Sequence, residues 1–222
     1  MPQIFADPTA PARVETQSLP WIPSPMPGVD RRMIERDGDE VARVTSVVRY
    51  APGSRFSPHT HSGGEEFLVL DGVFSDEHRD YPTGTYVRNP VGTRHQPHVV
   101  PGCTIFVKLW WMHPEDQTPA RVDTTDARLW VEASWGRRLL LHQFGAESVE
   151  MIDLRPGAVL PARETPGGEE IFIVRGSAVD AVEGTWIRRP EDAQPAFTAG
   201  PEGCQCYIRR GFLVHLPPHP IG

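Results

Sequence analysis

The sequence repeats itself over a long period, and this duplication restricts the fold more than any other feature. Residues 155–176 (RPGAVLPARETPGGEEIFIVRG) can be laid over residues 50–72 (YAPGSRFSPHTHSGGEEFLVLDG), so that Glu169 falls 104 residues after Glu65. Identical residues that recur at a constant offset over a span of more than twenty positions indicate two copies of one structural unit. The chain has 222 residues, enough for two domains of about a hundred residues each.

The repeat continues beyond these segments with one change of spacing. GTWIRRP (184–190) matches GTYVRNP (84–90) at an offset of 100. Four residues are therefore missing from the later copy, in the loop that corresponds to Ser75–Thr83.

Each copy is predicted to be all-β. The segments Val41–Tyr50, 65–72, 84–90 and 103–112 are rich in β-branched and apolar residues and are separated by Gly and Pro turns. The chain has 24 Pro and 20 Gly, which suits many short strands joined by tight turns. A sandwich or barrel is therefore expected for each copy.

Composition shifts predict the domain boundaries. Residues 1–30 form a Pro-rich arm, residues 31–113 a first domain, residues 114–128 a polar linker, and residues 129–222 a second domain. Proline fixes φ and lacks an amide donor, so the arm is expected to be extended.

Charge and composition argue against several classes of function. The net charge is −7 with Lys108 as the one lysine, so a nucleic-acid surface is not expected. No apolar run is long enough for a membrane span, and no secretory signal is evident. Three cysteines without a C-x-x-C pair do not form a disulfide framework. We therefore expect a cytoplasmic protein with buried thiols.

Four side chains of the first copy have the spacing of a metal site. His59 and His61, two residues apart on a strand, project from one face. The turn at 62–64 then places Glu65 beside them, and His95 follows a Pro-x-Gly turn on a later strand. Three imidazoles and one carboxylate suit a divalent transition-metal ion.

These residues also carry a resemblance to a known family. Gly53, His59, His61, Glu65 and Gly72, followed by Gly84, Pro90, Gly92 and His95, match the two motifs of the cupin superfamily in type and spacing. The resemblance implies two tandem cupin barrels, each a jelly roll (double-stranded β-helix). Val99 departs from the second motif, which often ends in Asn, but that position is not a ligand.

Within the cupins, residues 41–112 resemble the cupin-like domain of ChrR-type anti-sigma factors. EEFLVLDGVFSDEHRDYPTGTYVRNP is the most specific part of the match. The resemblance implies zinc binding through His59, His61, Glu65 and His95. The helical domain that grips the sigma factor in that family has no counterpart before this barrel, so a sigma-factor partner is not implied.

One divalent ion per chain is expected in the first barrel. Zn²⁺ and Fe²⁺ are favoured, and Mn²⁺ and Ni²⁺ also suit the ligand set. Glu66 is the alternative carboxylate, but Glu65 keeps the parity of the ligand face. His78 and His98 are interpreted as loop histidines outside the site.

The second copy lacks the same ligands. Arg163, Thr165 and Pro195 stand where the first copy has its three histidines, and Glu169 alone is retained. Arginine does not ligate cations at neutral pH, so the second barrel is predicted to be metal-free.

Two functions remain open, with a small molecule in the first barrel as partner in both. One is a metal-binding module that binds or senses a small molecule, with zinc held by four protein ligands. The other is an Fe(II)-dependent dioxygenase for a diketone or hydroxyketone, by analogy of fold and ligand set. No catalytic residue is identified, and a homodimer is compatible with either.

Overall fold

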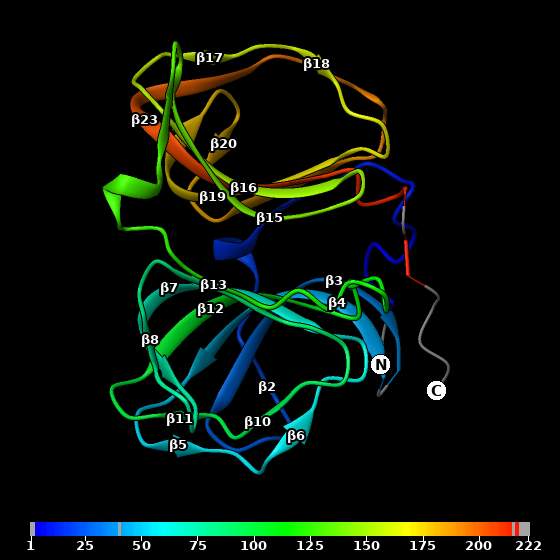
Figure 1. The fold of residues 1–222 in the computed structure, drawn as a ribbon, viewed down its shortest axis with the longest axis vertical. Helices are drawn as coiled ribbons and strands as arrows, with labels where there is room; N and C mark the ends of the chain where they lie inside the picture. Colours follow the sequence, from blue (N-terminus) through cyan, green and yellow to red (C-terminus); the bar gives the residue numbers. More distant parts are fainter. Residues whose placement is uncertain (1–2, 40, 215, 218–222) are drawn as a thin grey trace. The chain divides into compact units, whose positions relative to one another are not determined.

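The computed structural model describes residues 3–39, 41–214 and 216–217, and these fold into antiparallel β-sheets (Figure 1). The described residues contain no α-helix, only the 3-10 turns η1 (Thr16–Ser18) and η2 (Ala127–Leu129). None of their helical segments is long and apolar enough to cross a membrane. The expected all-β class is confirmed.

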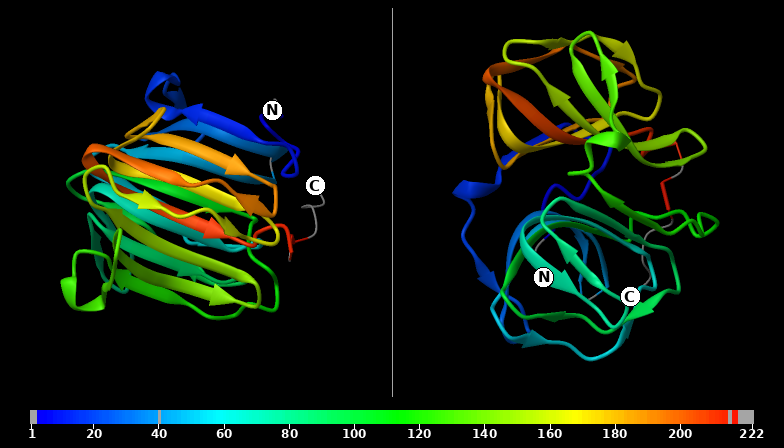
Figure 2. Two further views of the ribbon diagram at one scale, coloured as in Figure 1. Left: turned by 90° about the horizontal axis from the view of Figure 1, so that it is seen from above. Right: turned by 60° about the vertical axis from the view of Figure 1, so that its left-hand side comes forward.

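The chain divides into two compact units, each curled into a barrel (Figures 1 and 2). The first unit takes in residues 3–6, 19–125 and 217 of the described chain, and the second takes in residues 7–18 and 126–216.

The first unit holds the strands β2 (Ile22–Pro23), β3 (Val29–Gly38), β4 (Ala42–Tyr50), β5 (Ser54–Arg55), β6 (His59–Thr60), β7 (Glu65–Ser75), β8 (Asp80–Pro82), β9 (Thr85–Asn89), β10 (Arg94–His95), β11 (His98–Val99), β12 (Cys103–Leu109) and β13 (Ala120–Asp123). The second unit holds β1 (Ala12–Glu15), β14 (Val131–Ala133), β15 (Gly136–Phe144), β16 (Glu147–Leu154), β17 (Val159–Leu160), β18 (Arg163–Glu164), β19 (Glu169–Ala178), β20 (Ala181–Val182), β21 (Thr185–Arg189), β22 (Ala193–Gln194) and β23 (Phe197–Arg210).

The two main sheets have the same strand order. In the first unit the order is β13-β9-β7-β12-β4-β3-β2, and in the second it is β1-β21-β19-β23-β16-β15-β14. Each unit adds a two-stranded sheet, β10-β6 in the first and β18-β22 in the second. The duplication therefore extends to the pairing of every main strand.

Each barrel takes one edge strand from outside its own repeat. β1, within the Pro-rich arm, pairs with β21, and β13, within the linker, pairs with β9. Both strands follow a proline in nearly identical sequences, PARVET at 11–16 and PARVDT at 119–124. Thr16 and Thr124 each donate their hydroxyl to a glycine carbonyl, Gly184 and Gly84 respectively, at 2.7 Å.

The arm and the linker are thus parts of the barrels. The arm also supplies β2 and the start of β3 to the first unit, whereas the linker range supplies β13. The alternation of apolar and polar residues in β1 buries one side of that strand, in the pattern buried–exposed–buried–exposed.

The core of each barrel lies against the inner face of its main sheet. In the first unit it includes Phe67, Phe74 and Ile105, and in the second Ile171 and Ile208. The three cysteines are free and buried on β12 and β23, as expected.

A close backbone approach recurs in both copies. Gly72 and Gly176 have φ of +77° and +78°, and an added Cβ would lie 2.1 Å and 2.4 Å from the carbonyl oxygens of Gly102 and Gly203. Only glycine fits such a position without displacing backbone.

Candidate metal centre

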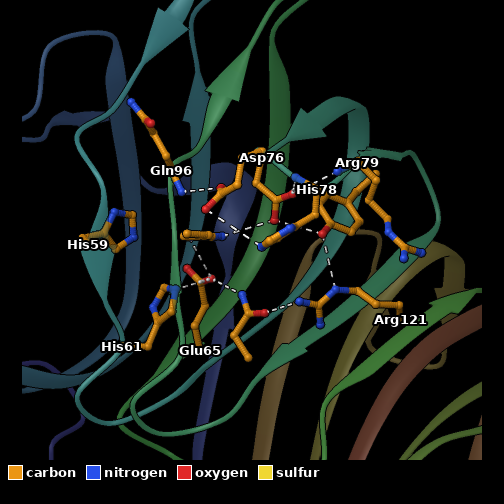
Figure 3. Close-up of polar contacts among 12 residues, drawn as sticks. His59, His61, Glu65, Asp76, His78, Arg79, Gln96 and Arg121 are labelled. Atoms are coloured by element: carbon orange, nitrogen blue, oxygen red, sulfur yellow. Dashed lines mark hydrogen bonds and ion pairs between the residues drawn. The ribbon is translucent and has the colours of Figure 1, made fainter.

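Three histidine side chains, His59, His61 and His95, converge in the first barrel. Figure 3 shows His59 and His61 on the same side as Glu65. β6 and β10 pair so that His59 lies directly opposite His95, and His61 follows two residues along the chain. The ring centroids are 4.6–5.0 Å apart, and one candidate ligand nitrogen from each ring lies within 4.8 Å of the others. Among the described residues no second cluster of this kind occurs.

Glu65 joins the histidines because the preceding turn is tightly packed. An added Cβ on Gly63 would lie 2.1 Å from the Trp110 ring, and one on Gly64 (φ +74°) would lie 2.4 Å from the Met112 sulfur. This turn therefore requires glycine at both positions. It places Glu65 Oε2 at 3.4 Å from His61 Nε2 and 3.7 Å from His95 Nε2.

The exposed and buried members of the group have different surroundings. His61, Glu65 and His95 are buried, whereas His59 is exposed. The Nδ1 of His59 lies 3.2 Å from the carbonyl oxygen of Ser57. Because a carbonyl only accepts, Nδ1 is the donor and Nε2 is left free as a ligand atom.

The residues fit a divalent metal ion. Nε2 of both His61 and His95 is buried without a hydrogen-bond partner, although buried polar atoms normally have one. Burial is the main cause that lowers the pKa of His61, which favours the neutral imidazole that metals bind. Atoms bound to one ion at about 2.0–2.2 Å lie roughly 3–3.5 Å apart in adjacent positions, close to the distances from Glu65.

A second layer of polar groups holds the ligands in place. Asn89 donates from Nδ2 to Glu65 Oε2 at 2.9 Å. Asp76 lies with Oδ2 at 3.6 Å from His95 Nδ1. At this distance Asp76 makes no hydrogen bond to the ring, whose Nδ1 is buried without a hydrogen-bond partner. Its charge nevertheless lies behind His95, where a carboxylate raises the basicity of a metal-binding imidazole.

Asp76 is itself fixed by three donors. It accepts backbone bonds from His78 at 2.8 Å and Arg79 at 3.1 Å, and the Tyr81 hydroxyl at 2.9 Å. Burial opposes the lowering of its pKa, but these hydrogen bonds outweigh burial and keep the carboxylate charged.

Arg121 of β13 connects these groups. Its Nη2 donates to the side-chain Oδ1 of Asn89, and its Nε lies 3.4 Å from the Tyr81 hydroxyl. A continuous polar path therefore runs from Glu65 through Asn89, Arg121 and Tyr81 to Asp76 and His95 (Figure 3). A residue of the segment 114–128, which the sequence predicts to be a linker, thus supports the site.

Glu66, the alternative carboxylate, lies on the other face of the sheet. It accepts from Tyr86 at 2.6 Å and from Arg88 at 2.8 Å. Lys108 shares that face and is buried there, with Nζ at 2.7 Å from Thr45 Oγ1 and 3.3 Å from Glu35 Oε1. Lys108 therefore neither enters the cavity nor reaches solvent.

Two further histidines lie apart from the cluster. The side chain of His78 is 63% exposed beside Glu77. His98 lies on the strand β11, where its backbone is opposite Arg55 of β5 and Ser75 of β7.

A cavity of about 740 Å³ adjoins the cluster. Its wall includes His59, His61 and Glu65, together with residues of β3, β4 and β12. This volume is in the usual range of small-molecule sites.

The second barrel holds an ion-pair cluster at the equivalent position. Glu169 accepts from Arg163, and from Arg210 Nε at 3.1 Å, and Arg189 Nη1 lies 3.7 Å away. Burial lowers the pKa of Arg163, but a guanidinium stays charged in proteins. Glu169 thus faces cations of the chain itself.

The structure corrects one assignment in this barrel. β22 pairs with β18 so that Gln194 lies opposite Arg163, as His95 lies opposite His59. The counterpart of His95 is therefore Gln194 and not Pro195. The turn after Pro190 is one residue shorter than in the first copy, which an ungapped comparison missed.

Comparison with known proteins agrees with this architecture. A family model described as the ChrR cupin-like domain matches the chain twice, over residues 9–113 and 118–214. A search of curated proteins finds no match.

Similar solved structures include a candidate dioxygenase from Nostoc punctiforme, with 16% identity, TM-score 0.68, and 91% of this chain and 83% of that chain covered. Bacterial pirin from Escherichia coli in complex with nickel(II) has 14% identity, TM-score 0.64, and coverage of 94% and 100%. Oxalate decarboxylase from Lactobacillus farciminis has 12% identity, TM-score 0.63, and coverage of 92% and 87%. At these identities the likeness concerns the fold alone.

Proposed function

The chain belongs to the ChrR cupin-like domain family, and we propose that it is a metal-binding bicupin that binds or senses a small molecule. His59, His61, Glu65 and His95 would hold one divalent transition-metal ion, Zn²⁺ or Fe²⁺, in the first barrel. The observation that carries the proposal is the pair of buried, partnerless Nε2 atoms of His61 and His95 beside the Glu65 carboxylate.

The charge of the cluster supports a cation. Metals bind the neutral form of an imidazole, so with three imidazole ligands the carboxylate of Glu65 would be the one anionic ligand, and a buried carboxylate is costly unless a cation pairs with it. A bound divalent ion would act as a Lewis acid toward an oxygen of a ligand. The chain's own residues would orient the site, through Asp76 behind His95 and Asn89 beside Glu65.

Metal analysis tests this proposal. Protein purified without added metal and then loaded with Zn²⁺ or Fe²⁺ is expected to keep about one ion per chain after dialysis. His59→Ala should lose that ion, whereas His78→Ala, an exposed histidine of the same barrel, should keep it. Equal metal content in both variants would contradict the assignment.

The adjoining cavity favours a second candidate function, an Fe(II)-dependent dioxygenase for a small diketone or hydroxyketone. The cavity reaches His59, His61 and Glu65, so a substrate oxygen could approach the ion. Oxygen uptake by the iron form with β-diketones and hydroxyaryl ketones tests it. Tight retention of zinc, with no oxygen consumed by the iron form, would exclude this activity and leave the binding function.

A further inference from the structure

The cavity beside the histidines has two arginines in its wall, Arg31 and Arg36. Both come from β3, whose register shift between Met33 and Glu35 returns Arg36 to the face of Arg31. Without that shift the two side chains, five residues apart, would point to opposite faces of the sheet.

The charges of Arg31 and Arg36 are not balanced by acidic residues around the cavity. Glu65 is the only acidic residue among the described residues that line the cavity, and it lies beside the histidines. The rest of the lining is apolar or neutral, with Val44, Val48 and Leu109 among its members.

Arg31 is the less constrained of the two cations. The Nε atoms of Arg31 and Arg36 are both buried without a hydrogen-bond partner, but within the described part of the chain the Arg31 side chain forms no ion pair. Arg36 instead donates from Nη2 to the Asp39 carbonyl oxygen, which anchors it. Burial, with Arg31 as a further cause, lowers the pKa of Arg36, so the two cations act on each other.

We propose that the cavity selects a small organic anion, whose carboxylate pairs with Arg31 while its other oxygen-bearing end reaches the histidine cluster. A guanidinium binds a carboxylate through two parallel hydrogen bonds, which would satisfy the Nε of Arg31. The cavity volume of about 740 Å³ limits the ligand to a small molecule. This inference rests on the proposed metal site for the second contact of the ligand.

Calorimetric titration of the zinc-loaded protein with acetoacetate and with its neutral methyl ester tests the proposal. The two probes share a skeleton and differ in the charge at one end. Acetoacetate is expected to bind more tightly than the ester. Arg31→Gln should reduce this ratio about ten- to a hundredfold, the range of a charge-assisted pair.

Two variants keep the test specific. Arg49→Gln, on the same barrel but paired with Asp30 at 2.7 Å, should leave the ratio unchanged. Arg31→Lys keeps the charge and should retain part of the preference. An equal affinity for both probes, or a ratio that Arg31→Gln leaves unaltered, would overturn the proposal.

The metal content of each variant separates the two proposals. A wild-type chain that holds no metal would refute the proposed function. A chain that holds metal but does not prefer the anion would refute the arginine site alone.

Discussion

The two barrels share a strand order and differ in what fills the same place. In the first, Glu65 lies beside the imidazoles of His61 and His95, and in the second Glu169 faces three guanidinium groups. Both carboxylates begin the equivalent strand after a glycine turn. In the second barrel the chain itself supplies the cations that compensate this carboxylate, whereas under the proposed function a bound ion would compensate Glu65 in the first.

The source of the cation also affects the stability of each barrel. A cation supplied by the chain is present whenever the barrel is folded, whereas an ion must be captured. The second barrel is therefore expected to be stable without metal, and the first to gain stability when its ion binds.

The largest expected effect is loss of a metal ligand. His95→Ala should weaken metal affinity more than about a hundredfold, beyond the range for outer groups. Competition with a chromogenic chelator measures it. Thr165→Ala, at the position of His61 in the second barrel, should change nothing, and a loss there would reverse the assignment of the two barrels.

Neutralising the two carboxylates should have opposite consequences, a loss of stability in the second barrel and a loss of metal binding in the first. Glu169→Gln removes the carboxylate partner of Arg163 and Arg189, while Arg210 keeps its ion pair with Glu150. The change should cost about 3 kcal/mol of unfolding free energy in the metal-free protein. Glu65→Gln should cost much less there, but should lose the ion. Denaturant unfolding with and without metal measures both, and equal losses in the metal-free protein would count against the distinction.

The carboxylate behind His95 is expected to have the next largest effect. Asp76→Asn keeps an acceptor for the backbone bonds but removes the charge, and should weaken metal affinity about ten- to a hundredfold. Chelator competition measures it. The matched change Glu77→Gln, on an exposed neighbour, should leave affinity within error.

The edge strand from the linker should give the smallest change. Arg121→Met removes the link between Asn89 and Tyr81, and should weaken metal affinity by about tenfold or less. Arg13→Met, its counterpart on β1, should have no effect on metal affinity. A similar loss in both variants would indicate a general effect on the fold.

Sequence spacing was sufficient to predict the all-β class, the duplication and the group of side chains that converges in the first barrel. His59 lies on β6 and His61 directly after that strand, and the glycine turn restricts where Glu65 lies, so short-range geometry determines their placement. The fold assignment is confirmed by the strand pairing and by the family match.

Three supporting residues, Asp76, Tyr81 and Arg121, lie in segments that the sequence predicts to be loops or linker, whereas Asn89 ends a predicted strand. Asp76 and Tyr81 lie in the stretch that is four residues longer in the first copy, and an insertion found only beside the ligand-bearing copy was a usable signal. Arg121 belongs to PARVDT, whose match to PARVET at 11–16 would have revealed an edge strand. An alignment of the two copies without gaps pairs His95 with Pro195, and a gap of one residue is needed to pair it with Gln194.

Anomalous diffraction from crystals of the metal-loaded protein, recorded at the absorption edge of the added metal, tests the central claim most directly. The account predicts one anomalous peak per chain, among His59, His61, Glu65 and His95, and no peak beside Glu169. A peak in the second barrel, or none in the first from fully loaded protein, would contradict it.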